Sequence, residues 1–325
     1  MDVAELVGRW LPEARVISVG ALSGGFVNGM ERVETDAGTF ALRRCVSETT
    51  AEMVAWEHAL LERVTPSVPE VVAPLATADG ATFVEDEGRV VSLWPFVAGR
   101  AMDPRDAGDR LVAGRILGRL HTALSEVRDT GARPGYPALV EADWHENRWW
   151  SWSGVDLESL GASGMPLDIG ERVDLRIFDR AVEEVPEALQ ALNNDALPRV
   201  LIHGDFHEGN LLIGDDGEVA AVLDWDECRL DWRAWDVANA LWSFCRNETN
   251  SGLDREAATA FLGAYEPLGG ALFAGERAAM GLLVRASRLW EALWGLGEIQ
   301  RGRPGWDYFE LNVAAVEGLR GFELS

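Results

Sequence analysis

The stretch that decides the fold runs from Leu201 to Asp226 and reads LIHGDFHEGN LLIGDDGEVA AVLDWD. Its middle predicts a β-hairpin, because two short apolar runs flank a turn at 215–218 with Asp-Gly at its centre. Such a hairpin brings Asn210 and Asp224 together at its open end, with Asp205 nearby. Carboxylate and amide oxygens are the ligands that Mg²⁺ prefers. The stretch therefore predicts a magnesium site.

Length and composition indicate a globular protein with two lobes. The chain has 325 residues, of which 47% are hydrophobic and 26% are charged. It contains no apolar run long enough to span a bilayer, and its first residues lack a secretory signal, so we expect a cytoplasmic protein. Cys45, Cys228 and Cys245 form no paired motif and are expected to be free thiols.

The formal net charge is −25. A field of this sign repels nucleic acid and anionic membranes, so we expect neither as a partner. The favoured interpretation of the charge is solubility or adaptation of the host to salt. The alternative is that it attracts a cationic substrate.

Three antiparallel strands are predicted near the N-terminus, over residues 16–22, 30–35 and 39–44. The turn between the first two contains Ser23, Gly24, Gly25 and Asn28. Glycine lets backbone N–H groups approach a phosphate closely, although two glycines between strands are more often only a turn.

A helix capped by Ser47 is predicted over residues 48–64. Glu57 lies beside its inward face and is a candidate partner for Arg43, which ends the third strand. In isolation, two unrelated surface charges are the simpler interpretation. A second hairpin is predicted over residues 81–85 and 89–96, and the lobe boundary near residues 97–99.

The remainder of the chain has mainly helical periodicity. His121 lies on the inward face of the first of these helices and is expected to be a core histidine. The segment 143–152 is dense in aromatic and polar residues. The predicted helices cover residues 107–125, 172–185, 231–245 and 277–296.

Residues 201–210 resemble the H-G-D-x-H-x-x-N loop of aminoglycoside phosphotransferase-like kinases, including the homoserine kinase type II-like enzymes. Residues 223–226 resemble the second metal motif of that family, and Asp236 matches the acidic residue that follows it. Arg43 departs from the usual lysine, although related small-molecule kinases carry arginine there. The resemblance covers nearly the whole chain.

This resemblance implies an α+β, protein-kinase-like bilobal fold. Residues 1–97 would form an N-lobe with a small antiparallel five-stranded sheet and a helix, and residues 98–325 a mainly helical C-lobe. ATP would bind in the cleft, with the backbone near Trp94 and Phe96 at the adenine. The glycine turn, Arg43 and Glu57 would serve the phosphates.

The implied reaction is Mg²⁺-dependent transfer of the γ-phosphate of ATP to a hydroxyl group. Asp205 would accept or orient the hydroxyl proton, and Asn210 and Asp224 would hold the metal. His203 would fix the loop. Three further residues would brace it, namely His207, Asp226 and Asp236.

The acceptor is expected to be a small hydroxylated molecule, with cationic ones among the candidates: an aminoglycoside-like antibiotic, an amino alcohol such as homoserine or choline, or a sugar. Relatives build their acceptor pocket at the segment that here contains Asp143, Trp144, Glu146, Arg148 and Trp149. Packing of the helical lobe is the alternative role for its tryptophans. Glu291 and Asp307 are weaker candidates.

Three other functions compete with this one. A protein Ser/Thr kinase is disfavoured because only about ten residues separate Asp224 from the next predicted helix, which leaves no long activation segment. A metallohydrolase would use His203, Asp205 and His207, which would share one face if they lay on a strand. A nucleotide-binding protein without catalysis is disfavoured because all three residues of the predicted metal corner are present.

Overall fold

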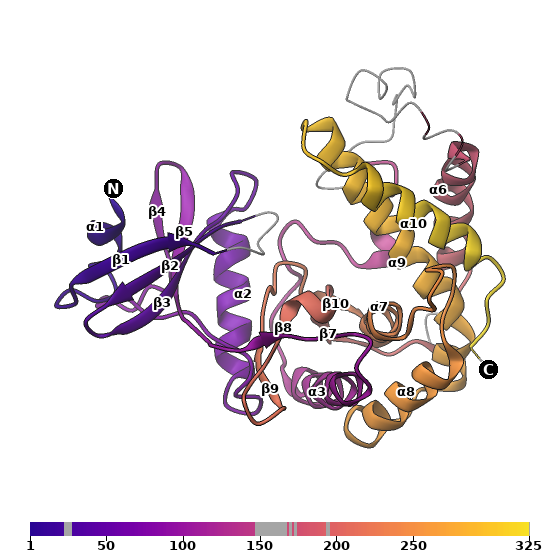
Figure 1. The fold of residues 1–325 in the computed structure, drawn as a ribbon, viewed down its shortest axis with the longest axis horizontal. Coiled ribbons are helices and arrows are strands. Elements are labelled where there is room, and N and C mark those ends of the chain that lie inside the picture. Colours follow the sequence, from indigo (N-terminus) through magenta and orange to yellow (C-terminus); the bar gives the residue numbers. More distant parts are fainter. Residues whose placement is uncertain (23–27, 147–167, 169–170, 172–173, 193–195, 325) are drawn as a thin grey trace. The chain divides into compact units, whose positions relative to one another are not determined.

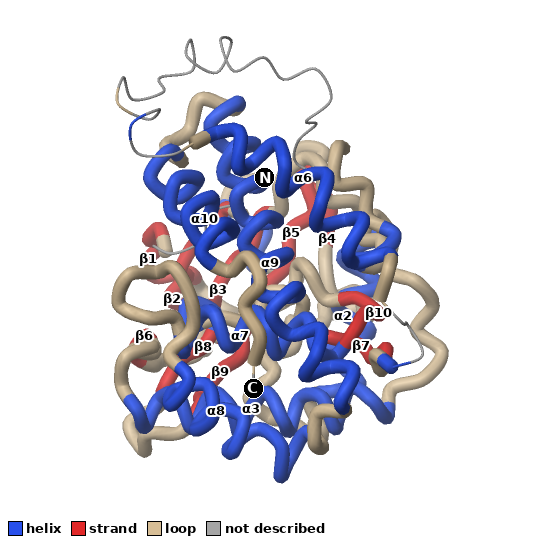
Figure 2. The backbone as a smooth tube through the Cα atoms, turned by 90° about the vertical axis from the view of Figure 1, so that its right-hand side faces the viewer, coloured by secondary structure: helices blue, strands red, loops and turns tan. Residues whose placement is uncertain are grey.

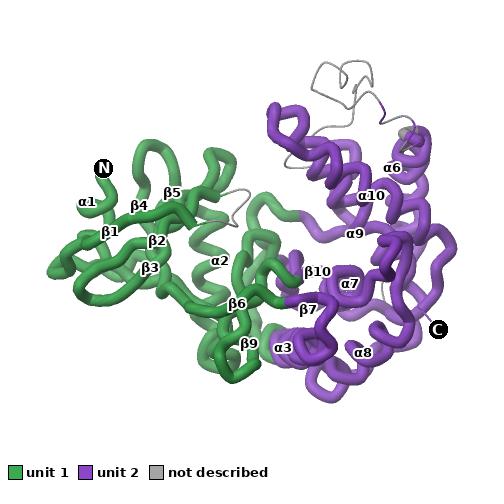
Figure 3. The backbone as a smooth tube through the Cα atoms, viewed as in Figure 1, with its two compact units in different colours: residues 1–102, 123–136, 208–228 green, residues 103–122, 137–207, 229–325 purple. Residues whose placement is uncertain are grey.

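The computed structural model describes residues 1–22, 28–146, 168, 171, 174–192 and 196–324 (Figure 1). The chain divides into two compact units, coloured green and purple in Figure 3. Unit 1 comprises Met1–Met102, Ala123–Tyr136 and Glu208–Cys228, and unit 2 comprises Asp103–Thr122, Pro137–His207 and Arg229–Ser325. The lobe boundary near residue 97 stays a prediction. The first segment of unit 1 ends at Met102, and unit 1 also includes two segments from later in the chain.

An antiparallel sheet of five strands in the order β1-β2-β3-β5-β4 forms the centre of unit 1 (Figure 1). The predicted three-strand meander and second hairpin are both present in it. The strands are β1 (Val16–Ala21), β2 (Gly29–Thr35), β3 (Gly38–Arg44), β4 (Val84–Asp86) and β5 (Arg89–Pro95).

The two faces of this sheet receive different helices, because neighbouring residues of a strand point to opposite sides. Leu42 belongs to a buried apolar cluster with Leu6 and Val7 of α1 (Val3–Val7). Arg43, the next residue along β3, instead reaches Glu57 of α2 (Ala51–Val64). One face therefore builds an apolar core, and the other presents a charged group to a helix.

The start of α2 differs from the prediction. Thr50, and not Ser47, is the N-cap, and its hydroxyl accepts a hydrogen bond from the Met53 N–H at 3.3 Å. Both residues suit an N-cap, so the sequence pattern alone did not distinguish them.

The predicted hairpin of the 201–226 stretch is confirmed as β8 (Leu211–Ile213) and β9 (Val219–Val222). Both strands join β6 (Arg100–Ala101) in a small sheet of unit 1, and the one-turn 3₁₀ helix η3 (Glu208–Asn210) precedes β8. A parallel bridge from Val71 to Val222 attaches this sheet to the chain that follows α2.

Unit 2 is mainly helical, as Figure 2 shows by colour. Helix α9 packs against α6, α7 and α10. The helices are α3 (Ala107–Glu126, whose last turn belongs to unit 1), α6 (Leu175–Gln190), α7 (Arg233–Cys245), α8 (Arg255–Gly269), α9 (Ala274–Gln300), α10 (Trp306–Gly318) and the short η1 (Leu139–Glu141).

A two-stranded ribbon, β7 (Arg199–Ile202) paired with β10 (Arg229–Trp232), completes unit 2. The prediction of a helix from Asp231 was wrong at its start, because Asp231 and Trp232 pair with Val200 and Arg199 before α7 begins. Among the described residues, the helices include none with the length and apolar character needed to cross a membrane. Cys45, Cys228 and Cys245 all lie in the described part of the chain and form no disulfide there, as predicted, and all three are buried.

Candidate active site

The open end of the β8–β9 hairpin holds the two predicted metal ligands in unit 1. The Leu223 N–H donates to the Asn210 carbonyl at 2.8 Å, so Asn210 and Asp224 stand at the same end of the ladder. Asp224 is exposed and has a φ of 57°, in the left-handed region that non-glycine residues rarely adopt. Backbone strain of this kind gathers at functional sites.

These two side chains fit a divalent cation that takes oxygen ligands. Mg²⁺ is usually bound by one or two protein groups and keeps several water molecules and phosphate oxygens. Asn210 and Asp224 supply one amide and one carboxylate of that type. Neither a thiol nor an imidazole is needed for such a site.

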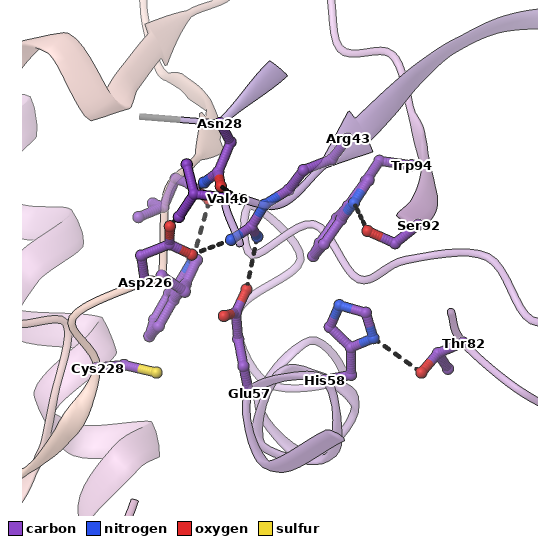
Figure 4. A network of polar contacts seen from close by, with 12 residues as sticks. Asn28, Arg43, Val46, Glu57, His58, Thr82, Ser92, Trp94, Asp226 and Cys228 are labelled. Carbon is purple, nitrogen blue, oxygen red and sulfur yellow. Dashed lines mark hydrogen bonds and ion pairs between the residues drawn. The ribbon is translucent and has the colours of Figure 1, made fainter. Parts of the chain in front are cut away.

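Arg43 is the centre of a charged cluster in unit 1 (Figure 4). It donates to Glu57 at 2.9 Å through one terminal nitrogen and to Asp226 through the other. The predicted Arg43–Glu57 pair is thus present, and both side chains are buried. Asp226 also accepts from the Asn28 amide at 2.7 Å. It therefore joins Arg43 to Asn28, a residue of the predicted glycine turn.

Electrostatics fix the charge states in this cluster. Burial disfavours the charged Arg43 guanidinium, but the carboxylates of Asp226 and Glu57 outweigh it and raise the pKa of Arg43. Burial and the positive charge of Arg43 lower the pKa of His58 to about 3, so this imidazole is neutral. His58 contacts Thr82 at 2.8 Å and packs edge-on against the Trp94 ring (Figure 4).

Arg133 is a member of this cluster that the sequence did not reveal. One of its terminal nitrogens donates to Glu57 at 3.3 Å. The other donates to the Trp225 and Cys228 carbonyls and to the Cys228 sulfur, at 2.9, 2.9 and 2.8 Å. Arg133 lies in a loop rich in Gly and Pro, where no periodicity marks a buried position. Its distance of 76 residues from Glu57 gave no local signal either.

The other predicted nucleotide-binding residues lie near the end of β5. Trp94 is half-buried, and its indole donates to Ser92 at 2.8 Å. The Phe96 N–H donates to the Thr39 carbonyl at 3.3 Å, so this N–H is engaged within the sheet. Ser23, Gly24 and Gly25 lie outside the described residues.

In unit 2, Asp236 braces the predicted catalytic loop. Its two carboxylate oxygens accept the backbone N–H groups of His203 and Gly204, each at 2.7 Å. The Gly204 carbonyl in turn accepts from Trp235 at 3.1 Å and from Asn239 at 3.0 Å. A buried carboxylate that receives two backbone N–H groups holds a loop in one conformation.

The brace extends into the core through His121, which is buried as predicted. Its Nε2 contacts Asp236 at 3.2 Å, and its Nδ1 contacts the Tyr265 hydroxyl at 2.8 Å. Burial acts to raise the pKa of Asp236, but the hydrogen bond and charge of His121 outweigh it and lower this pKa. Asp236 is therefore ionised in the core.

The loop presents Asp205 at the surface of unit 2, with one third of its side chain exposed. His207 Nε2 lies 3.4 Å from the Asp205 carboxylate, and the Asp205 N–H donates to His203 Nδ1 at 3.3 Å. A half-exposed carboxylate on a braced loop can accept a hydrogen bond from an incoming hydroxyl. His203 itself is fully buried and fixes the loop from inside.

The predicted acceptor residues differ in burial, and two of them lie outside the described part of the chain. Trp144 is buried and packs edge-on against Trp290 at 5.3 Å, which is a packing role. Asp143 and Glu146 are exposed, and the Asp143 carboxylate accepts the Glu146 N–H at 3.2 Å. Arg148 and Trp149 lie outside the described residues.

Glu291, a weaker candidate in unit 2, lies beside Tyr308 and interacts electrostatically with Asp205. The Tyr308 hydroxyl donates to its carboxylate at 2.5 Å. Burial raises the pKa of Glu291, and the negative charge of Asp205 raises it further, whereas Arg288 opposes both. Glu291 is thus within electrostatic range of the predicted catalytic carboxylate. Asp307, the other weaker candidate, is exposed on α10.

The metallohydrolase alternative fails on geometry. It needed residues 203–207 on a strand, but β7 ends at Ile202 and His203 points into the core. In the described part of the chain, no group of three or more His, Cys, Asp or Glu side chains is arranged to hold a metal ion.

The sequence is similar to known proteins over most of its length. The model of a phosphotransferase enzyme family matches residues 18–274. A homoserine kinase of Zymomonas mobilis is 22% identical over 288 residues, which cover 89% of this chain and 83% of that protein.

Two solved structures share the fold at low sequence identity. A choline kinase from Streptococcus pneumoniae superposes with a TM-score of 0.68 at 17% identity, covering 98% of each chain. An amicoumacin kinase in complex with AMP-PNP and Ca²⁺ also gives a TM-score of 0.68, at 14% identity, covering 94% of this chain and 89% of that one.

Proposed function

Because the chain belongs to the phosphotransferase enzyme family and is an ATP-dependent kinase acting on a hydroxyl of a small molecule, we propose that its acceptor is an amino alcohol. The cationic amine would bind at Glu291, and the hydroxyl would face Asp205. The homoserine kinase relative and the choline kinase neighbour are consistent with an acceptor of this class.

Several of the predicted site residues have roles in this proposed reaction. Asp205 orients the acceptor hydroxyl and takes its proton as the new P–O bond forms. Asn210 and Asp224 would hold Mg²⁺, which when bound would offset the charge of the phosphates. Arg43 donates to phosphate oxygens from the position that Glu57 and Asp226 fix. Asp236 and His203 keep the loop in place.

The observation that supports an amino alcohol as the acceptor is the Glu291 carboxylate. It accepts a hydrogen bond from Tyr308 and lies within electrostatic range of Asp205. Two carboxylates close enough to raise a pKa repel each other, and a cation placed between them removes that repulsion. Trp294 packs edge-on against Tyr308 at 5.5 Å, which adds an aromatic surface beside the carboxylate. Aromatic rings next to a carboxylate favour alkylammonium groups.

A protein acceptor has less support. The segment between Asp224 and α7, which starts at Arg233, is fully described and short. It offers little chain on which a peptide substrate could dock.

The experiment that tests the proposal is a phosphoryl-transfer screen of the purified protein. Ethanolamine, choline, homoserine and 1-amino-2-propanol are compared with neutral sugars, and product formation is measured rather than ATP loss. We expect transfer to at least one amino alcohol, abolished in Asp205→Asn. Transfer only to neutral sugars would exclude the amino alcohol.

Glu291→Gln tests the amine site. We expect the acceptor KM to rise by about tenfold or more, with the ATP KM nearly unchanged, because the variant loses the negative charge that faces the ammonium group. Glu256→Gln, which makes the same change at an exposed position of α8, is the control and should leave both constants near wild type. Equal effects of Glu291→Gln on both substrates would indicate a packing role.

A further inference from the structure

Arg133 connects two parts of unit 1 that the reaction needs together. One end of its guanidinium contacts Glu57, the carboxylate that holds Arg43. The other end contacts the backbone of residues 225–228, which directly follow Asp224. Glu57 and Cys228, the two ends of this connection, are labelled in Figure 4. Arg133 therefore contacts both Glu57, the partner of Arg43, and the backbone that follows Asp224.

The chemistry of the connection requires arginine. The guanidinium is planar and offers five N–H donors in a fixed fork, so it can serve acceptors on two sides at once. Lysine has a single nitrogen on a flexible stem and would reach one side or the other. Arg133 is only 5% exposed, and its guanidinium packs against the rings of Trp56 and Tyr136, at 5.6 and 4.6 Å, which fixes its plane.

The charges of the cluster also depend on Arg133. Two guanidinium groups, of Arg43 and Arg133, face two carboxylates, of Glu57 and Asp226. Each oxygen of Glu57 is taken by a different arginine. Without Arg133, Glu57 would keep only Arg43 as a partner, and the backbone of residues 225–228 would lose its guanidinium donor, so that Arg43 alone would join Asp226 to α2.

We propose that Arg133 is a positioning residue that sets the Arg43–Glu57 pair and the Asp224 turn in register, so that ATP and its metal bind as one unit. The inference rests on the proposed roles of Arg43 and Asp224 but not on the identity of the acceptor. Arg133 acts through Glu57 and the backbone of residues 225–228 and itself touches no reacting atom.

The test compares Arg133→Lys with Arg233→Lys. Arg233 is a matched control in unit 2, because it too pairs with one glutamate, Glu276, and with two backbone carbonyls, those of Gly269 and Ala271. Three quantities are measured: the affinity for AMP-PNP, the Mg²⁺ concentration that gives half-maximal binding, and the thermal midpoint. Arg133→Gln is the second variant should Arg133→Lys be insoluble.

For Arg133→Lys we expect the half-maximal Mg²⁺ concentration to rise by about tenfold or more, as seen when the partners of metal ligands are removed. The affinity for AMP-PNP should fall with it. Arg233→Lys should lower the thermal midpoint and leave both binding constants near wild type.

A purely structural role predicts a different result. If Arg133→Lys loses thermal stability as Arg233→Lys does but binds AMP-PNP and Mg²⁺ like wild type, the proposal is wrong. It is also wrong if neither Arg133 variant folds while Arg233→Lys does. Because AMP-PNP binding needs no acceptor, these outcomes are separate from a failure to phosphorylate amino alcohols.

Discussion

At the scale of single residues, the charged cluster around Glu57 disfavours a positive charge on the neighbouring His58. Removing one partner from a buried ion pair typically costs about 3–5 kcal/mol, because the remaining charge stays in a poorly solvating environment. The same reasoning applies to adding a charge. His58 lies next to Arg43 and is buried, so its protonation would place a second cation beside the guanidinium.

His58 therefore makes stability depend on pH. Its native pKa of about 3 lies below the unfolded value of 6.5, so between these values the unfolded chain binds the extra proton. Stability from this group is fully present above pH 6.5 and is lost as pH falls toward 3. The slope is up to about 1.4 kcal/mol per pH unit.

We expect His58→Gln to remove this slope. Urea unfolding of wild type and variant between pH 4 and pH 7 measures it, and the stability difference between them should shrink as pH falls. His145→Gln, at an exposed position, is the control and should follow wild type. Parallel profiles for wild type and His58→Gln would contradict a neutral His58.

The sequence predicts pairs of residues that lie in motifs of known order, such as Arg43 with Glu57. It places Asp236 near the loop for the same reason. It does not reveal Arg133, because burial of a charged residue in a loop is decided by tertiary contacts alone. The partners of Asp226 were also not predicted, since both Asn28 and Arg43 are more than 180 positions away.

At the scale of elements, the contact of α3 with α8 is linked to the proposed catalytic loop through Tyr265, His121 and Asp236. Gly118 lies against α8, and a Cβ there would sit 2.7 Å from the Tyr265 carbonyl and 2.9 Å from the Gly269 nitrogen. Tyr265 holds His121, which holds Asp236. The small residue thus allows the close approach on which the brace depends.

Gly118→Ala should cost about 1–3 kcal/mol, because backbone atoms must move to admit the methyl group. Gly263→Ala, in α8, is the matched control: nothing lies within 4 Å of its Cβ, so a gain of about 0.5–1 kcal/mol is expected from helix propensity. Chemical denaturation measures both. Similar stability changes in the two variants would show that the helices do not meet so closely.

Element boundaries show where periodicity fails. The β-strands of unit 1 were predicted within a few residues because alternation and turn residues agree. β10 was missed because its four residues run directly into α7 without a turn or a cap. Its existence depends on β7, an earlier segment with which it pairs.

At the scale of the whole molecule, the net charge of −25 has two interpretations, solubility and substrate steering. They differ in how each substrate responds to salt. A field of this sign speeds the arrival of a cationic acceptor and slows that of anionic ATP, and both effects weaken as the Debye length falls below about 10 Å, near 0.1 M salt.

If steering operates, raising KCl from 20 to 300 mM should lower kcat/KM for an amino alcohol with a net positive charge, such as ethanolamine or choline, and raise it for ATP. Each constant is measured with the other substrate saturating, and repetition with sodium acetate separates ionic strength from effects of a particular ion. The opposite signs are the decisive feature, because general loss of activity in salt lowers both constants. If the two constants move together, the charge serves solubility, and recognition of the amine rests on close contacts such as those of Glu291.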